Sequence, residues 1–257
     1  MKEERPLIFI SNDDGYSAKG LTDLIEMVRE MGDVIVVAPE GSRSGSSTAI
    51  TCDIPVRLRL IREEPGLQIY ACSGTPCDCV KLAFDYVLPH TPDIILAGIN
   101  HGDNAAVNTH YSGTMAVAFE GTMKQVPSVA FSSCMVAADA DFSPLTSYVR
   151  KIVQTVLSNG LPDDVCLNVN FPDRPFFQGI KVCRMGRGEW TNEWERRIDT
   201  RHRAYFWLTG SLTSFDADDP ATDRWALNNG YVAITPTQLD MTAYKAMEKL
   251  TDTFSHL

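Results

Sequence analysis

The chain has 257 residues, of which 44% are hydrophobic and 22% are charged, a composition typical of folded rather than disordered proteins. Its 23 Lys and Arg against 33 Asp and Glu give a formal net charge of −10, which disfavours long nucleic acids as partners because their phosphate backbone would be repelled. The apolar run from Leu7 to Ile10 is too short for a signal peptide, and the seven cysteines are an odd number in a long chain, so we expect a cytoplasmic protein with reduced thiols and no membrane segment.

The first half of the chain alternates strand-like and helix-like patterns. A short apolar run predicts a strand over residues 7–11, and apolar residues at helical spacing predict a helix from just after Gly20 to about Gly32. The β-branched run over 34–38 is suited to a strand that is buried on both faces. The alternating segments over 49–70, which prolines interrupt, predict antiparallel ribbons inserted beside the main sheet.

The second half of the chain is less regular. In the first half of the chain, Thr75 is a residue type that caps helices and Pro76 is typical of a first helical turn, so we expect a helix to start there. After this helix and through to the end of the chain, the remaining strands are expected over 94–97, 127–132, 166–170, 180–183, 205–208 and 231–235. The remaining helices are expected over 113–123, 145–157 and 243–254.

This alternation predicts an α/β fold with a mostly parallel sheet and helices on both faces. We expect residues 1–135 to form a core that carries the candidate site, and residues 136–257 to complete that core within the same structural unit. Ligands of such sheets bind beyond the carboxyl ends of the strands. Because several polar clusters follow predicted strands, we expect their side chains to converge at one edge of the sheet.

Asp13 and Asp14 are adjacent carboxylates at the end of the first predicted strand. Two such groups repel each other unless a cation or a proton offsets the charge. Ser44 and Asn100 follow other predicted strands and offer a hydroxyl and a carbonyl oxygen. Oxygen ligands of this kind suit a hard divalent ion such as Mg²⁺ or Mn²⁺. The alternative interpretation is an acidic turn that caps the next helix, together with an ordinary loop serine and a turn-forming asparagine.

A second cluster has the residue types of an anion site. Ser112 is a candidate N-cap of the helix over 113–123, and Gly113 permits close approach of a ligand to free backbone N–H groups. Arg43, in a Gly- and Ser-rich loop, is suited to a phosphate. Plain helix capping remains the alternative for Ser112. The sequence contains neither a complete P-loop motif nor a dinucleotide-binding glycine fingerprint.

A series of short motifs runs in order along almost the whole chain. The motifs are Ser11-Asn-Asp-Asp-Gly15, Val37-Ala-Pro39 with Arg43-Ser-Gly45, Gly74-Thr-Pro76 with Asp78-Cys-Val80, Pro92-Asp93, Gly98-Ile-Asn100 with Gly102 and Asn104, Tyr111-Ser-Gly-Thr114 with Glu120-Gly121, Asn168-Val-Asn170 with Pro172, and Gly230-Tyr-Val232. Together they resemble the SurE family, the stationary-phase survival proteins that act as metal-dependent nucleoside monophosphatases.

The resemblance implies a 5'-nucleotidase with a three-layer α/β/α, Rossmann-like core. It also implies one divalent ion per subunit, Mg²⁺ or Mn²⁺, and a small phosphate-bearing substrate. The implied metal ligands are Asp13, Asp14, Ser44 and Asn100. The implied phosphate-binding residues are Asn104, Ser112, Gly113 and Thr114.

The resemblance further implies homodimers or homotetramers that exchange C-terminal elements between subunits. Residues 184–203 are dense in arginine and acidic residues, which is typical of a solvated, ion-paired ribbon. The alternative is an oligomer arm whose Trp190, Trp194 and Trp207 pack on a neighbouring subunit. Two stretches depart from the family pattern. One is residues 39–42, and the other is residues 105–110, which stand where the family has a Gly- and Asp-rich loop.

We therefore expect hydrolysis of nucleoside 5'- or 3'-monophosphates by a water molecule at a divalent-metal centre, with Asp13 and Asp14 as the catalytic residues. A nucleotide- or anion-binding regulator without turnover would use the same pocket and is the main alternative. A phosphatase with an aspartyl nucleophile is a further alternative, although that class usually spaces its carboxylates as Asp-x-Asp.

Overall fold

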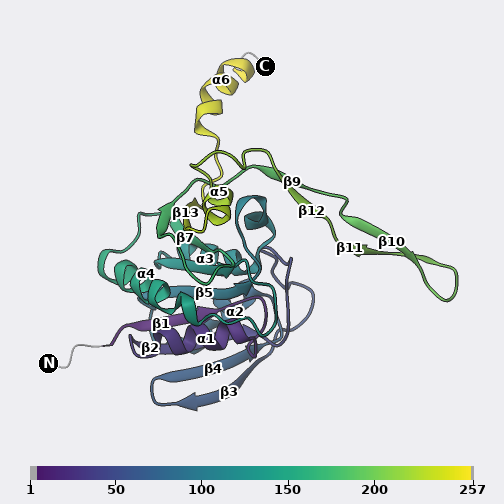
Figure 1. Ribbon diagram of the computed structural model, residues 1–257. Helices are drawn as coiled ribbons and strands as arrows, with labels where there is room; N and C mark the ends of the chain where they lie inside the picture. The colour runs from purple at the N-terminus through teal and green to yellow at the C-terminus, as the bar shows by residue number, and fades with distance from the viewer. Residues whose placement is uncertain (1–4, 256–257) are drawn as a thin grey trace.

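The computed structural model describes residues 5–255, and its main feature is a nine-stranded sheet (Figure 1). The strands run across the sheet in the order β3 (Leu58–Glu64), β4 (Leu67–Cys72), β2 (Asp33–Pro39), β1 (Leu7–Ser11), β5 (Ile94–His101), β6 (Ser128–Ser133), β7 (Val165–Phe171), β13 (Val232–Gln238) and β8 (Ile180–Val182). Within this sheet, β3 pairs with β4 and β13 pairs with β7 in the antiparallel sense, and the other neighbours are parallel. The predicted α/β class with a mostly parallel sheet is confirmed.

Helices cover both faces of the sheet. The four that form these layers are α1 (Lys19–Val28), α2 (Pro76–Leu82), α3 (Gly113–Met123) and α4 (Thr146–Asn159). Ile8 and Ile10 of β1 pack in one apolar cluster with α1 and α4, whereas Leu7 and Phe9 pack in a second cluster with α2 and α3. The alternation follows from the two-residue period of a strand. It produces the three-layer α/β/α core that the family resemblance implied.

Capping residues fix where the two helices nearest the candidate site begin. Thr75 accepts a hydrogen bond from Asp78 N at the start of α2, and the Asp78 carboxylate accepts one from Thr75 N, which completes a capping box. Ser112 Oγ accepts a hydrogen bond from Met115 N, 3.0 Å away, at the start of α3. Both N-caps are those expected from the sequence, and they set the position of the loops that precede each helix.

Several segments differ from the sequence-based expectation. The helix α1 ends at Val28 rather than near Gly32. The ribbon expected over 49–70 begins only at β3, because Thr51 donates hydrogen bonds to Asp78 instead of pairing with a strand, and β4 joins the main sheet by pairing with β2. Short helical elements outside the expected set are η1 (Ala83–Val87), η2 (Ala106–Tyr111), η3 (Ser143–Leu145) and α5 (Asp223–Asn228).

Two C-terminal elements extend away from the body of the molecule (Figure 1). One is the β-arm, which consists of the antiparallel pair β9 (Gly188–Thr191) and β12 (Ser211–Ser214) followed by the antiparallel pair β10 (Trp194–Ile198) and β11 (Ala204–Leu208). The other is α6 (Tyr244–Phe254), in which no residue is buried. Residues 5–255 form no helix with the length and apolar character that crossing a bilayer requires.

Candidate active site

Polar residues that follow neighbouring strands line a cavity of about 360 Å³ at the carboxyl edge of the sheet. Five of the residues expected to form the site belong to this lining, namely Asp13, Ser44, Asn100, Asn104 and Ser112. They come from the loops after β1 and β2, from β5 and from the segment between β5 and α3. The parallel topology therefore brings together residues up to 99 positions apart, from Asp13 to Ser112.

Asp13 lies against the N-terminus of α3 and is only 4% exposed. Its Oδ1 accepts a hydrogen bond from the Thr114 hydroxyl. A Cβ atom on Gly113 would lie 2.7 Å from the Cβ of Asp13, so only glycine leaves room for the carboxylate here. Burial raises the pKa of Asp13 to about 6, while the hydrogen bond from Thr114 lowers it and the Asp14 charge raises it. Asp13 is thus held firmly in a place where its negative charge is costly.

Asp14 is half-buried beside β5, outside the cavity lining. Its Oδ2 lies 3.4 Å from His101 N, which donates a hydrogen bond to it. Burial raises the pKa of Asp14, and both this hydrogen bond and the charge of His101 oppose the rise. Both adjacent carboxyl groups are therefore harder to ionise than a carboxyl in water.

Asn100 and Ser44 add neutral oxygens to the cavity lining. The Nδ2 of Asn100 donates to Gly102 O at 2.7 Å, and no hydrogen bond within residues 5–255 occupies its Oδ1. The exposed Ser44 has its Oγ 3.0 Å from Ser42 Oγ. An amide oxygen and a hydroxyl are consequently available near the Asp13 carboxylate.

This donor set fits a hard divalent cation. Residues 5–255 hold no group of three or more His, Cys, Asp or Glu side chains placed to bind a metal ion. An ion at this position would instead be held by two carboxylates, a hydroxyl and an amide oxygen, which is a set that suits Mg²⁺ or Mn²⁺ rather than a soft metal. The raised pKa values of Asp13 and Asp14 support the assignment, since a nearby cation offsets the charge that burial disfavours.

The residues expected to bind phosphate fall into two groups. Ser112 and Asn104 line the cavity. Gly113 and Thr114 lie behind Asp13 and position its carboxylate. Arg43 lies outside the lining, because its guanidinium donates to Ser73 O at 2.8 Å, while its backbone N–H donates to Asp13 O at 2.6 Å. The structure therefore brings part of this set to the cavity and uses the rest to support Asp13.

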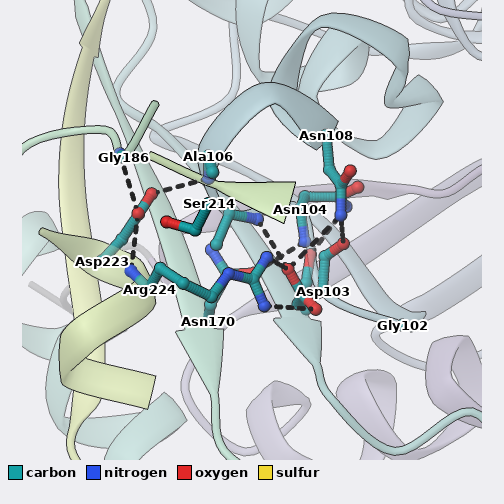
Figure 2. Close-up of polar contacts among 12 residues, drawn as sticks. Gly102, Asp103, Asn104, Ala106, Asn108, Asn170, Gly186, Ser214, Asp223 and Arg224 are labelled. Atoms are coloured by element: carbon teal, nitrogen blue, oxygen red, sulfur yellow. Dashed lines mark hydrogen bonds and ion pairs between the residues drawn. The ribbon is translucent and has the colours of Figure 1, made fainter. Parts of the chain in front are cut away.

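Asn104 is held by a buried amide network whose other members sequence reasoning missed (Figure 2). Its backbone N–H donates to Asn170 Oδ1 at 2.8 Å, and its carbonyl oxygen accepts from Asn168 Nδ2 at 2.8 Å. Its own Nδ2 donates to Ser132 Oγ at 2.8 Å. The signal in the sequence is a pair of asparagines two positions apart inside a buried strand, which puts both amides on one face of β7.

A charged network ties the same loop to α5 (Figure 2). Asp103, which lines the cavity, pairs with Arg224 through contacts of 2.6 and 3.2 Å. Asp223 is fully buried and accepts hydrogen bonds from the backbone N–H groups of Gly186, Ala106 and Arg224. The bond to Ala106 holds a non-glycine residue at a φ of 51°, a left-handed conformation that is uncommon for a residue with a side chain.

The base of the β-arm closes the remaining side of the cavity. Trp190, Glu193, Leu208 and Thr209 belong to the lining. Trp190 Nε1 donates a hydrogen bond to Asn108 Oδ1 at 2.9 Å, so this tryptophan packs within its own chain. Trp194 and Trp207 are exposed farther along the arm. The arm thus contributes to the cavity at its base and leaves an apolar surface at its far part.

Comparisons with known proteins agree with this architecture. A family model described as "Survival protein SurE" matches residues 8–192. A protein of Phocaeicola vulgatus named 5'-nucleotidase SurE is 52% identical over 250 residues, which cover 97% of each chain. A protein of the same name from Bacteroides thetaiotaomicron is 51% identical over 252 residues, 97% of this chain and 96% of the relative. The crystal structure of the SurE protein from Aquifex aeolicus superposes with a TM-score of 0.82 at 35% identity, over 96% of this chain and 99% of that one. The chain described here belongs to the SurE family.

Proposed function

We propose that the protein is a 5'-nucleotidase, a phosphomonoesterase that hydrolyses nucleoside 5'- or 3'-monophosphates with the help of a divalent cation. The observation that carries this proposal is the buried Asp13 carboxylate, held at the head of α3 and facing a cavity with neutral oxygen donors. The relatives named 5'-nucleotidase SurE support it, since they align over nearly the whole chain.

The cation, Mg²⁺ or Mn²⁺ at one site per subunit, would be held by Asp13, Asp14, Ser44 and Asn100. When bound, such an ion offsets the two carboxylate charges and polarises a phosphoryl oxygen. Thr114 and Gly113 hold Asp13 in place throughout. Ser112 and Asn104 lie in the lining, where a hydroxyl and an amide can donate hydrogen bonds to the phosphate oxygens.

Water acts as the nucleophile in this proposal. Its oxygen attacks the phosphorus atom and the ester P–O bond breaks, so that one proton of the water ends on the oxygen of the leaving nucleoside and the other stays with the phosphate. A carboxylate that ligates a cation is a poorer attacking group, which argues against Asp13 or Asp14 as a covalent nucleophile. The protein's contribution is mainly to position the phosphate and to stabilise its charge.

Phosphate release from a panel of nucleoside 5'- and 3'-monophosphates, with Mn²⁺ or Mg²⁺ and with or without a chelator, tests the proposal. We expect release that requires the added ion and stops with the chelator. If the protein binds these nucleotides but releases no phosphate with either ion, it is a binding regulator and the proposal is wrong. A phospho-aspartate trapped during turnover would instead support an aspartyl nucleophile.

We also propose that the protein forms homodimers or homotetramers through its projecting elements. On α6, Tyr244, Met247, Leu250 and Phe254 are each about half exposed or more and recur at helical spacing, so they form one apolar stripe. The far part of the β-arm exposes Trp194, Phe206 and Trp207. Apolar surfaces of this extent are typical of interfaces. The seven free cysteines support a cytoplasmic location.

A further inference from the structure

The lining of the cavity comes from two parts of the molecule, the edge of the sheet and the β-arm. The edge of the sheet contributes polar residues such as Asp13, Asn100 and Ser112, whereas the β-arm contributes the apolar side chains of Trp190 and Leu208. The volume of about 360 Å³ lies in the range of sites that enclose a whole organic ligand, and a phosphate group alone would leave much of it empty. The region next to the arm is therefore placed to receive whatever is esterified to the phosphate.

The arm is bent where it meets the cavity. The ladder between its two strands is interrupted between the pairs Thr191–Ser211 and Trp194–Leu208. Within this break Asn192 has a φ of 53°, a left-handed conformation that is uncommon for a residue with a side chain. Thr209 N donates to Glu193 O at 2.8 Å, which keeps the two strands together across the break. The cavity-lining residues of the arm therefore lie at a bend that a backbone hydrogen bond holds together.

Trp190 is fixed by its polar edge. Its Nε1 donates to Asn108 Oδ1 at 2.9 Å, and Asn108 Nδ2 in turn donates to Asp103 O at 3.2 Å. The only hydrogen-bonding group of the indole is thus used, and its faces remain as an apolar wall. Tyr111 and Leu208 also line the cavity although they are 58% and 66% exposed. Exposed apolar side chains around a polar site suit a ligand with a flat, apolar face.

Glu193 supplies the one ionisable side chain of the arm in the lining. No hydrogen bond or ion pair within the described residues, 5–255, engages its carboxylate. By contrast Glu195, two positions farther along, pairs with Arg197 at 2.8 Å. A carboxylate repels a phosphate but accepts hydrogen bonds from amino groups, so Glu193 is suited to contact the part of a ligand that carries hydrogen-bond donors.

We propose that the bent base of the β-arm is the nucleobase subsite, in which Trp190 stacks on the base and Glu193 accepts a hydrogen bond from an exocyclic amino group. This inference rests on the proposed nucleotidase function and assigns its base preference. Adenine, cytosine and guanine carry an exocyclic amine, whereas uracil presents a carbonyl oxygen that a carboxylate would repel. The enzyme therefore favours nucleotides with amino-bearing bases over uridine monophosphate.

The test is kcat/KM for adenosine, cytidine and uridine 5'-monophosphates and for ribose 5-phosphate, which has the same phosphoester but no base. We expect Glu193→Gln to reduce the preference for amino-bearing bases over uracil by about tenfold, because glutamine can both donate and accept. We expect Trp190→Leu to raise KM for all the nucleotides by about tenfold, with a much smaller change in kcat and in the hydrolysis of ribose 5-phosphate. Trp190→Phe, which keeps an aromatic face, should lie in between.

Glu195→Gln and Phe215→Leu are the matched controls, since Glu195 belongs to the same arm, Phe215 directly follows its strand β12, and both lie outside the cavity lining. The inference is overturned if the Trp190 and Glu193 variants behave like these controls. It is also overturned if they slow ribose 5-phosphate and the nucleotides by the same factor, because that would indicate a purely structural role. A wild-type protein inactive on all four compounds would contradict the proposed function itself, which is a different outcome.

Discussion

At the scale of single residues, Asp13 combines tight fixation with an unfavourable charge. Thr114, Gly113 and the head of α3 hold the carboxylate in place, and burial raises its pKa to about 6. A group placed for stability alone would not be ionised at this cost. The arrangement fits a cation site, because a bound cation would offset the free-energy cost of the buried negative charge.

The free-energy cost of ionising the buried Asp13 predicts how pH affects the stability of the metal-free protein. The pKa of Asp13 rises from 3.8 in the unfolded chain to about 6 in the fold, a difference of about 3 kcal/mol. The folded state therefore binds its proton more tightly, so the stabilisation from protonated Asp13 is complete below pH 3.8 and is lost as the pH rises through 6. The neutral amide introduced by Asp13→Asn would mimic the protonated form. The quantity to compare is the unfolding free energy of Asp13→Asn minus that of the wild type. We expect this difference to increase by up to about 3 kcal/mol between pH 4 and pH 8.

Urea unfolding of both proteins at these two pH values, with chelator present, measures the difference. Addition of Mn²⁺ at pH 8 should stabilise the wild type and not the variant. If the wild type is the more stable of the two at pH 8 without metal, Asp13 does not carry the charge cost described here.

At the scale of elements, α5 supports the site although it contributes no residue to the cavity lining. Asp223, in its first turn, receives three backbone hydrogen bonds, from the first residue of η2, from the segment before the β-arm and from α5 itself. One buried carboxylate thus joins three segments that are distant in sequence. The adjacent Arg224 pairs with Asp103 in the lining.

Removal of this carboxylate predicts a large effect on both fold and site. Asp223→Ala leaves three backbone N–H groups, two of them buried and one partly buried, without their partner, and we expect it to lower the free energy of unfolding by at least about 2 kcal/mol and to raise KM. Asp163→Ala, at an exposed position whose carboxylate makes no hydrogen bond or ion pair within residues 5–255, is the control and should change neither quantity. Chemical denaturation and steady-state kinetics provide the readings. Equal stability of the two variants would show that Asp223 does not join these segments.

Much of the element pattern can be read from the sequence, because β1 and β2 have uninterrupted apolar runs and α3 has a clear N-cap. The helix α5 cannot, since it is only six residues long and half of its residues are polar. The rule that parallel strands end at a common edge predicted the grouping of Asp13, Asn100 and Asn104. The same rule says nothing about Trp190 and Glu193, whose place in the lining depends on the contact between the base of the β-arm and η2. Local patterns carry no information on such a tertiary contact.

At the scale of the whole molecule, α6 and the far part of the β-arm leave the body with their apolar residues uncovered (Figure 1). Burial of the α6 stripe against a second copy of the chain predicts a dimer or a tetramer in light scattering. A chain truncated after Thr242, which lacks α6, should form a smaller assembly while its far-ultraviolet circular dichroism still shows a folded core. A monodisperse monomer of the full-length chain would contradict the proposed assembly.

The central claim is that catalysis takes place at Asp13. The most direct measurement is phosphate release from adenosine 5'-monophosphate with Mn²⁺ by Asp13→Asn, beside wild type and beside Asp163→Asn, an exposed control just before β7 at the amino end of that strand. We predict that Asp13→Asn lowers kcat/KM by about a hundredfold or more while the protein stays folded, and that the control keeps the wild-type rate. A folded Asp13→Asn protein with the wild-type rate would contradict the account.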